Sequence, residues 1–136
     1  MLKVIDLKES KLELRAYDIE VSTPNETAKI DSLRTDSEHH TAWGIFLHDP
    51  EYTGEASTLD TKSRISCSVN GERVVENAHA CLFLANKGVS LEDTAWKFKV
   101  PIQQSEISIE YKDAAKYAAE NYPRTVTLYL ICEKKK

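Results

Sequence analysis

The sequence RISCSVNGERVVEN, residues 64–77, contains the strongest local structural signal in the chain. Ile65, Cys67 and Val69 alternate with polar residues, which is the period of a strand with one buried face. The Asn70-Gly71 pair that comes next is typical of a type I′ turn, because Asn and Gly adopt positive φ angles at low cost. The segment therefore predicts a β-hairpin with a two-residue turn.

Segments on both sides of this hairpin share the two-residue period. We predict further strands over 2–7, 12–21, 40–48, 78–85, 96–100, 106–111 and 124–132. The 40–48 strand has two apolar faces, Trp43/Ile45/Leu47 and Ala42/Gly44/Phe46, so we expect it to be central and covered on both sides. In 12–21 the apolar parity changes near Ala16, which indicates a bulge or a change of buried face.

Three segments favour a helix. Residues 23–26 (TPNE) have the form of a capping box with proline at the first helical position, but the next residues, 27–35, are weakly apolar. For 24–34 a short helix and a strand therefore remain equal alternatives. Residues 90–93 predict a single helical turn. Residues 112–122 (KDAAKYAAENY) are good helix formers and predict a short helix that ends before Pro123.

Together these patterns predict one mainly β domain over residues 1–136. The expected architecture is an antiparallel β-sandwich or barrel of about 8–10 strands with one short C-terminal helix. The alternative is an α+β fold with that helix packed on one sheet face. Residues 133–136, a glutamate followed by three lysines, are expected to form a solvated tail.

The amino-acid composition limits the cellular environments and the classes of partner that we expect for this protein. A net charge of −4, with 41% hydrophobic and 29% charged residues, is ordinary for a soluble domain and gives no basic face for nucleic acid. No run approaches the ~20 apolar residues of a membrane span, and the first residues lack a secretory signal pattern. Three cysteines, none in a CxxC pair, favour a reduced cytoplasmic chain. A Cys67–Cys81 bridge is left open.

Acidic residues gather around the 40–48 strand. Six lie between residues 36 and 60, with no lysine or arginine among them. If the loops at the two ends of the strand approach each other, they form a negative patch that would steer a partner with a basic surface. The binding residues predicted on this basis are Glu38, Trp43, Asp49, Glu51, Tyr52 and Glu55. The simpler interpretation is that the acidic loops serve solubility.

Catalytic and metal patterns are absent from the sequence. His39 and His40 are adjacent and would point to opposite strand faces, so they do not predict a metal site. There is no P-loop, nucleophile elbow or dinucleotide fingerprint. We therefore predict no metal, no cofactor and no catalytic residue, although paired carboxylates remain a hydrolase alternative. Trp43 and Trp96 are expected in the core. The tyrosines expected to be exposed are Tyr52, Tyr111, Tyr117 and Tyr122.

The resulting hypothesis is a non-enzymatic, cytoplasmic protein that binds another macromolecule. Inhibitors, immunity proteins and assembly components of phage or bacterial systems have this character. The alternatives are a carbohydrate- or small-ligand-binding β-sandwich and a hydrolase with paired carboxylates. Membrane and nucleic-acid partners are not expected, and pairing of exposed strand edges offers a route to a homo-oligomer.

Overall fold

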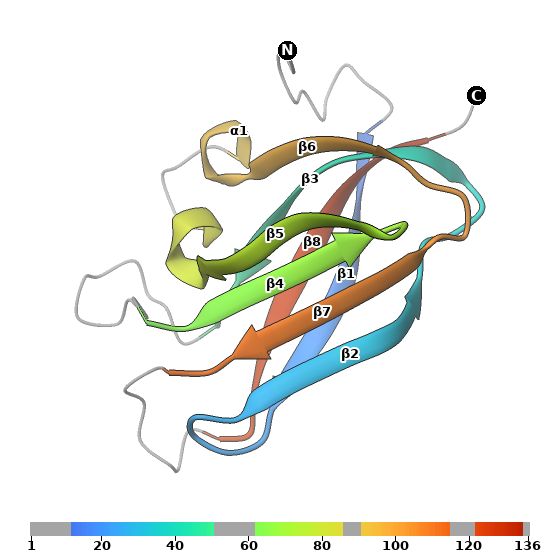
Figure 1. Ribbon diagram of the computed structural model, residues 1–136. Helices are drawn as coiled ribbons and strands as arrows, with labels where there is room; N and C mark the ends of the chain where they lie inside the picture. Colours follow the sequence, from blue (N-terminus) through green and yellow to red (C-terminus); the bar gives the residue numbers. More distant parts are fainter. Residues whose placement is uncertain (1–11, 51–61, 86–90, 115–121, 135–136) are drawn as a thin grey trace.

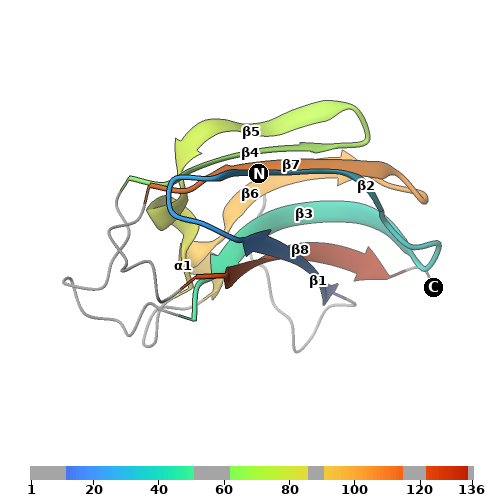
Figure 2. The ribbon, with the colours of Figure 1, turned by 90° about the horizontal axis from the view of Figure 1, so that it is seen from below.

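A computed structural model describes residues 12–50, 62–85, 91–114 and 122–134 of the chain. Its eight strands are β1 (Leu12–Val21), β2 (Thr27–Arg34), β3 (His39–His48), β4 (Arg64–Val69), β5 (Glu72–His79), β6 (Trp96–Pro101), β7 (Glu106–Lys112) and β8 (Arg124–Lys134). They form two four-stranded sheets, ordered β1-β8-β3-β6 and β2-β7-β4-β5 (Figure 1). Figure 2 shows the two sheets as stacked layers. The predicted antiparallel sandwich is confirmed.

The strand order is that of a jelly roll. Within the described residues, β4 and β5 are the only pair of consecutive strands that are hydrogen-bonded to each other, and every pairing is antiparallel. The other connections pass between the sheets, which gives the two-sheet, eight-strand arrangement of that fold. Apart from β4 and β5, the strands that pair with each other are therefore far apart in the sequence.

The core lies between the two sheets. On β8, Val126, Leu128 and Leu130 are at most 1% exposed, and they face Ile107 and Ile109 of β7 across a shared apolar cluster. The alternation predicted for 106–111 and 124–132 is thus confirmed. Burial of this face is the main source of stability, because each fully buried aliphatic side chain contributes about 1.5–3 kcal/mol.

The predicted hairpin forms between β4 and β5. Asn70 and Gly71 have φ angles of 52° and 79°, and Val69 pairs with Glu72 directly across the turn. Both positive angles are those that a type I′ turn requires.

The face assignment predicted for β3 is wrong at its centre. The pairing of β3 with β8 shifts register between Ala42, which pairs with Cys132, and Gly44, which pairs with Ile131, so Trp43 is an extra residue relative to β8. Such a bulge reverses the parity of the residues after it. Ala42 therefore faces the core with Ile45, and Trp43 joins Phe46 in a second apolar cluster on the outer face. The strand is central, as predicted.

Strand β1 contains no bulge. Its pairing with β8 runs without a shift from Leu12 to Val21, so of the two predicted alternatives, a bulge or a change of buried face, the second applies. The buried face does change: Ile19 and Val21 lie in the core, whereas Leu12 packs with the outer cluster around Ile131.

The segments of uncertain type are now assigned. Residues 27–34 are strand β2 rather than helix, and Leu91–Thr94 forms the predicted helical turn, α1. The strand predicted over 78–85 is wrong beyond His79, because a 3₁₀ turn, η2 (Ala80–Phe83), places Ala80 and Phe83 toward the core. Of the helix predicted over 112–122, Lys112 is the last residue of strand β7. Residues 2–7 and 115–121 lie outside the described residues.

Trp96 closes one open side of the sandwich instead of entering the core. It is 45% exposed, and its indole N–H donates to the main-chain oxygen of Val74, 2.9 Å away. This bond joins the edge strands β6 and β5 of the two sheets. Among the helices that the structure describes, none combines the length and apolar character needed to cross a membrane.

Candidate functional site

The acidic residues predicted to form one patch lie at opposite ends of β3. Glu38 is exposed just before the strand, whereas Asp49 follows its last residue. The ten-residue strand between them spans about 30 Å. Glu51, Tyr52 and Glu55 lie outside the described residues, so their part in a binding surface stays a prediction. The structure does not bring Glu38 and Asp49 together.

Asp49 is part of a buried ion cluster. Its carboxylate is 4% exposed and accepts a hydrogen bond from Nη1 of Arg124 at 2.9 Å. The second guanidinium nitrogen donates to Asp113 at 2.6 Å and to the hydroxyl of Tyr111 at 3.1 Å. Arg124 begins β8 and Asp49 follows β3 of the same sheet, whereas Tyr111 lies on β7 of the other sheet and Asp113 follows that strand. The cluster therefore fastens the sheets together at this end.

Electrostatics inside this cluster keep Arg124 charged and Tyr122 neutral. Burial alone would lower the pKa of Arg124, but the neighbouring Tyr111, Asp113 and Asp49 raise it above its ordinary value. Burial raises the pKa of Tyr122 to about 12, helped by the hydrogen bond that its hydroxyl donates to Asp113. The charges are paired and enclosed, which suits a structural role better than direct contact with a partner.

Trp43, the other described member of the predicted surface, packs on the outer face of the β1-β8-β3-β6 sheet. Its indole N–H donates to Glu133 at 2.8 Å, and Nζ of Lys99 lies 5.1 Å from the ring centre. Glu133 also pairs with His40 at 3.5 Å. In the predicted tail of residues 133–136, Glu133 and Lys134 are instead the last two residues of β8, and residues 135–136 lie outside the described residues. Trp43 is half-buried and has its polar atom satisfied.

A polar hollow occupies the outer face of the other sheet. Two adjoining depressions, of about 520 and 260 Å³, share Ser68 of β4 and Ser108 of β7 in their lining. These two serines are directly paired across the strands. We call the combined feature the serine groove. It is lined by Lys29, Ile30, Asp31, Arg34, Ser66, Ser68, Asn70, Gly71, Arg73, Gln103, Gln104, Ser105, Glu106, Ser108, Ile109 and Glu110.

The groove arises from a difference in side-chain length across the sheet. On the two central strands it is lined by the small side chains Ser66, Ser68 and Ser108, together with Glu106 and Glu110 of β7. Longer side chains on the edge strands, Lys29 of β2 and Arg73 of β5, form the walls. Each of these serines alternates with core residues, so its hydroxyl faces outward because the strand period is two.

Charge is balanced in the groove lining. The described lining residues include three basic side chains, Lys29, Arg34 and Arg73, and three acidic ones, Asp31, Glu106 and Glu110. Lys29 and Glu110 form a 3.6 Å ion pair across β2 and β7. None of the lining residues is aromatic. The surface therefore offers many hydrogen-bond donors and acceptors with no excess of either charge.

One end of the groove is built by the β6–β7 connection. Arg34 donates to the main-chain oxygen of Gln104 at 3.1 Å, and the amide of Ser105 donates to Oγ1 of Thr35 at 2.7 Å. Gln104 has a positive φ of 47°, a conformation uncommon outside glycine. Bonds to the β2–β3 connection hold this end in place.

Sequence reasoning missed the groove, although its signal is visible. In both ISCSV and EISIEY, small serines occupy outward positions where charged residues are usual. Only the register, which pairs Ser68 with Ser108, brings those positions together. Of the tyrosines expected to be exposed, Tyr111 is 2% exposed and that prediction is wrong. Tyr122 is half-buried, and Tyr52 and Tyr117 lie outside the described residues.

The described residues contain neither a metal cluster nor an ionised thiol among the buried cysteines. No group of three His, Cys, Asp or Glu side chains suited to a metal ion occurs in that part of the chain. All three cysteines are free thiols, so Cys67 and Cys81 are not bridged. Burial raises the pKa of Cys67 to about 12 and that of Cys132 to about 12, which keeps both as neutral thiols.

Comparisons of the chain with known protein families, with curated proteins and with solved structures gave no match.

Proposed function

We propose that this protein is a binding module. Its serine groove binds a neutral ligand rich in hydroxyl groups, and the chemical class of that ligand is an oligosaccharide. The observation that carries the proposal is the group of three small hydroxyl side chains, Ser66, Ser68 and Ser108, on the two central strands, with longer polar side chains around them. A serine hydroxyl both donates and accepts hydrogen bonds, as a sugar hydroxyl does. Such a group fits a ligand with the same dual capacity.

The charge of the lining supports a neutral ligand. Three basic and three acidic side chains face the groove, and one pair, Lys29 with Glu110, is already joined. A strongly charged ligand would therefore meet like charges as well as opposite ones. Carboxylate, amide and guanidinium groups all hydrogen-bond to hydroxyls, so a neutral polyol can use every wall of the groove.

The dimensions support a chain of sugars rather than one sugar. From Glu106 to Glu110 the groove follows β7 for about 13 Å, and crossing from β2 to β5 adds three strand spacings, about 14 Å. A single hexose would leave much of this polar surface in water. Jelly rolls also include lectin domains, but that likeness is an analogy of fold and carries less weight than the groove itself.

The binding test uses four neutral hexasaccharides, built from glucose in β and α linkage, mannose and N-acetylglucosamine. Isothermal titration calorimetry with the full chain should detect binding of at least one of them. Ser68→Phe, which fills the groove from an outward position, should weaken that binding about tenfold or more, a loss of about 1.4 kcal/mol. Ser108→Phe should act in the same way because it fills the same groove.

Thr125→Phe is the matched control. Thr125 is exposed on the outer face of β8 in the opposite sheet, so the same bulk there should leave binding unchanged. The proposal would be contradicted if none of the four hexasaccharides binds, or if the Ser68→Phe and Thr125→Phe variants bind the sugar with equal affinity.

The location of the protein is a second part of the proposal. We infer that the chain works in a reducing compartment such as the cytoplasm, as its three free cysteines suggest. The macromolecular partner expected at the acidic 36–60 segment is a separate hypothesis. The burial of Asp49 and its distance from Glu38 lead us to favour the groove.

A further inference from the structure

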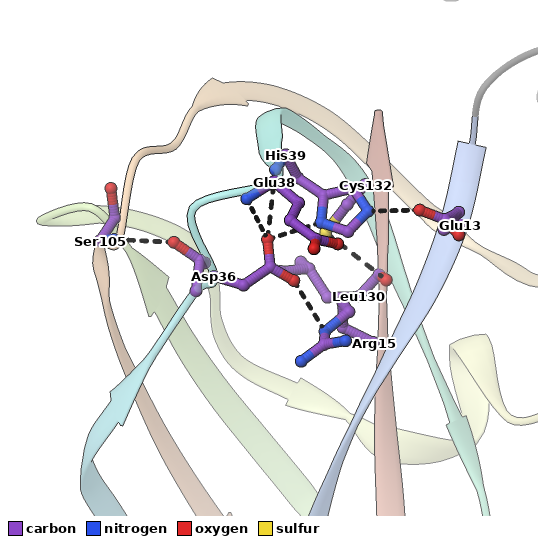
Figure 3. A network of polar contacts seen from close by, with 9 residues as sticks. Glu13, Arg15, Asp36, Glu38, His39, Ser105, Leu130 and Cys132 are labelled. Carbon is purple, nitrogen blue, oxygen red and sulfur yellow. Dashed lines mark hydrogen bonds and ion pairs between the residues drawn. The ribbon is translucent and has the colours of Figure 1, made fainter. Parts of the chain in front are cut away.

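His39 is a buried histidine held between two carboxylates. Its side chain is 2% exposed at the start of β3. Nδ1 lies 2.7 Å from Oδ1 of Asp36, and Nε2 lies 2.9 Å from Oε1 of Glu13 (Figure 3). Glu13 comes from β1 and Asp36 from the β2–β3 connection. Two segments distant in sequence therefore meet on one imidazole ring.

These two contacts depend on how many protons the His39 ring carries. An ionised carboxylate only accepts hydrogen bonds, and a neutral imidazole carries a single N–H. Both contacts of His39 are hydrogen bonds only when both ring nitrogens carry protons. If one proton leaves, a ring lone pair faces a carboxylate oxygen at hydrogen-bond distance, and that contact becomes repulsive.

Charged and titratable groups reach the ring from each element packed against it. Arg15 of β1 pairs through Nε with Oδ2 of Asp36 at 3.1 Å. From β8 come the neutral thiol of Cys132 and the paired residue Lys134. Tyr17 of β1 interacts with Asp36 and Cys132, and burial raises its pKa to about 12, so it is neutral as well. The carboxylates of Asp36 and Glu13 are therefore the charged groups in direct contact with the ring.

Asp36 connects the ring to the serine groove. Its carboxylate holds the amides of Glu38 and His39, at 3.0 and 3.1 Å. Its main-chain oxygen accepts the amide of Gln104 at 3.3 Å, and the adjacent Thr35 amide donates to the main-chain oxygen of Ser105 at 2.8 Å. Figure 1 shows the β2–β3 and β6–β7 connections running side by side at this end of the sandwich. Gln104 and Ser105 line the groove.

We propose that His39 is a proton-dependent latch on the groove. With both ring nitrogens protonated, Asp36 and Glu13 are held, and the 103–105 end of the groove keeps its shape. Loss of one ring proton as pH rises breaks one of the two hydrogen bonds between the ring and the carboxylates, and this loosens the contacts from Asp36 to Gln104. The effect on ligand binding rests on the proposed function, whereas the latch itself is a property of the free protein.

The latch is tested by nuclear magnetic resonance on the ¹⁵N-labelled full chain between about pH 5 and 9, where histidine changes charge. The amide shifts of Gln104 and Ser105 should titrate with the same midpoint as the His39 ring. In His39→Gln this titration should vanish from both amides. His48→Gln, at an exposed histidine on the other end of β3, should leave it unchanged.

A second variant keeps the buried ring in place. Glu13→Gln removes one facing charge from a side chain that is 48% exposed. It should move the shared midpoint of the ring and the two amides to lower pH, because a nearby carboxylate favours the charged ring. Amide shifts that do not follow the ring, or a midpoint that stays fixed in Glu13→Gln, would overturn the latch.

Binding supplies a separate readout. Affinity for the tightest of the four hexasaccharides should fall about fivefold or more between pH 5.5 and 8.5, a typical coupling between two sites. The same comparison in Glu13→Gln should show the fall beginning at lower pH. If none of the sugars binds, the proposed function fails, while the amide titration still decides whether the latch exists.

Discussion

At the scale of single residues, Arg124 is a buried cation that contacts two buried acids. Its guanidinium is 1% exposed and pairs with Asp49, which follows β3, and with Asp113, which follows β7 of the other sheet. Pairing two buried acids with one buried cation avoids the cost of an isolated charge. The sequence could not reveal this, because Asp49 follows a strand as surface acids often do, and Arg124 begins one beside a proline.

Removing this cation leaves two carboxylates without compensation. Arg124→Met should lower the free energy of unfolding by about 3–5 kcal/mol, the usual cost of breaking a buried pair. Urea denaturation followed by tryptophan fluorescence measures it. Arg64→Met is the control, since Arg64 makes an exposed hydrogen bond to the oxygen of Asn77 worth about 1 kcal/mol. Equal losses in the two variants would contradict the structural role of the cluster.

Asp36 should give the protein part of its acid sensitivity. Burial alone would raise its pKa, but hydrogen bonds from His39 and Glu38 and the charges of His39 and Arg15 lower it. A carboxyl whose folded pKa is lowered stabilises the protein above its unfolded pKa, about 3.9. That stability is lost as pH falls through the folded pKa.

Asp36→Asn should therefore flatten the acid limb of the stability profile. Below about pH 4, the unfolding free energy of the natural protein should fall more steeply than that of the variant, as measured by urea midpoints. Glu20→Gln, at an exposed carboxylate of β1, should keep the natural slope. The same slope in Asp36→Asn would show that Asp36 does not contribute.

At the scale of secondary-structure elements, the sequence predicted correctly those features that depend on neighbouring residues alone. The Asn70-Gly71 hairpin was predictable because the turn type depends on two adjacent residues. Strand β8 was predictable because both of its faces alternate cleanly. The bulge at Trp43 was not, since it depends on the pairing of β3 with strands far away in the chain. The 3₁₀ turn at Ala80 replaced a strand because a short apolar run does not specify its period.

Gly44 provides a test of the bulge. A Cβ atom at this position would lie 2.8 Å from the main-chain oxygen of Trp96, closer than real contacts allow. Gly44→Ala should therefore destabilise the protein by about 1–3 kcal/mol, the usual cost of overpacking, and thermal unfolding measures it. Gly71→Ala is strained by its positive φ but meets nothing within 4 Å. Unlike Gly44→Ala, it should leave the β3–β6 amide signals unchanged.

At the scale of the whole molecule, the sandwich class was predictable but the jelly-roll order was not. Alternation in many short strands indicates two packed sheets, while the choice of neighbours depends on contacts between distant segments. The serine groove has the same origin, because Ser68 and Ser108 become neighbours only through that order. The acidic patch was expected from sequence proximity, yet the length of β3 separates Glu38 from Asp49. Edge-to-edge assembly remains a prediction.

The outer face of the β2-β7-β4-β5 sheet is the binding surface that we propose, and ligand binding depends on it. The most direct measurement is a map of amide shift changes on the ¹⁵N-labelled chain as the tightest-binding hexasaccharide is added. Changes should concentrate on Ser66, Ser68, Arg73, Gln104 and Ser108, with Thr125 and Thr127 of the opposite sheet unaffected. Changes centred instead on Glu38, Trp43 or the outer face of β8, or none at all, would contradict this assignment.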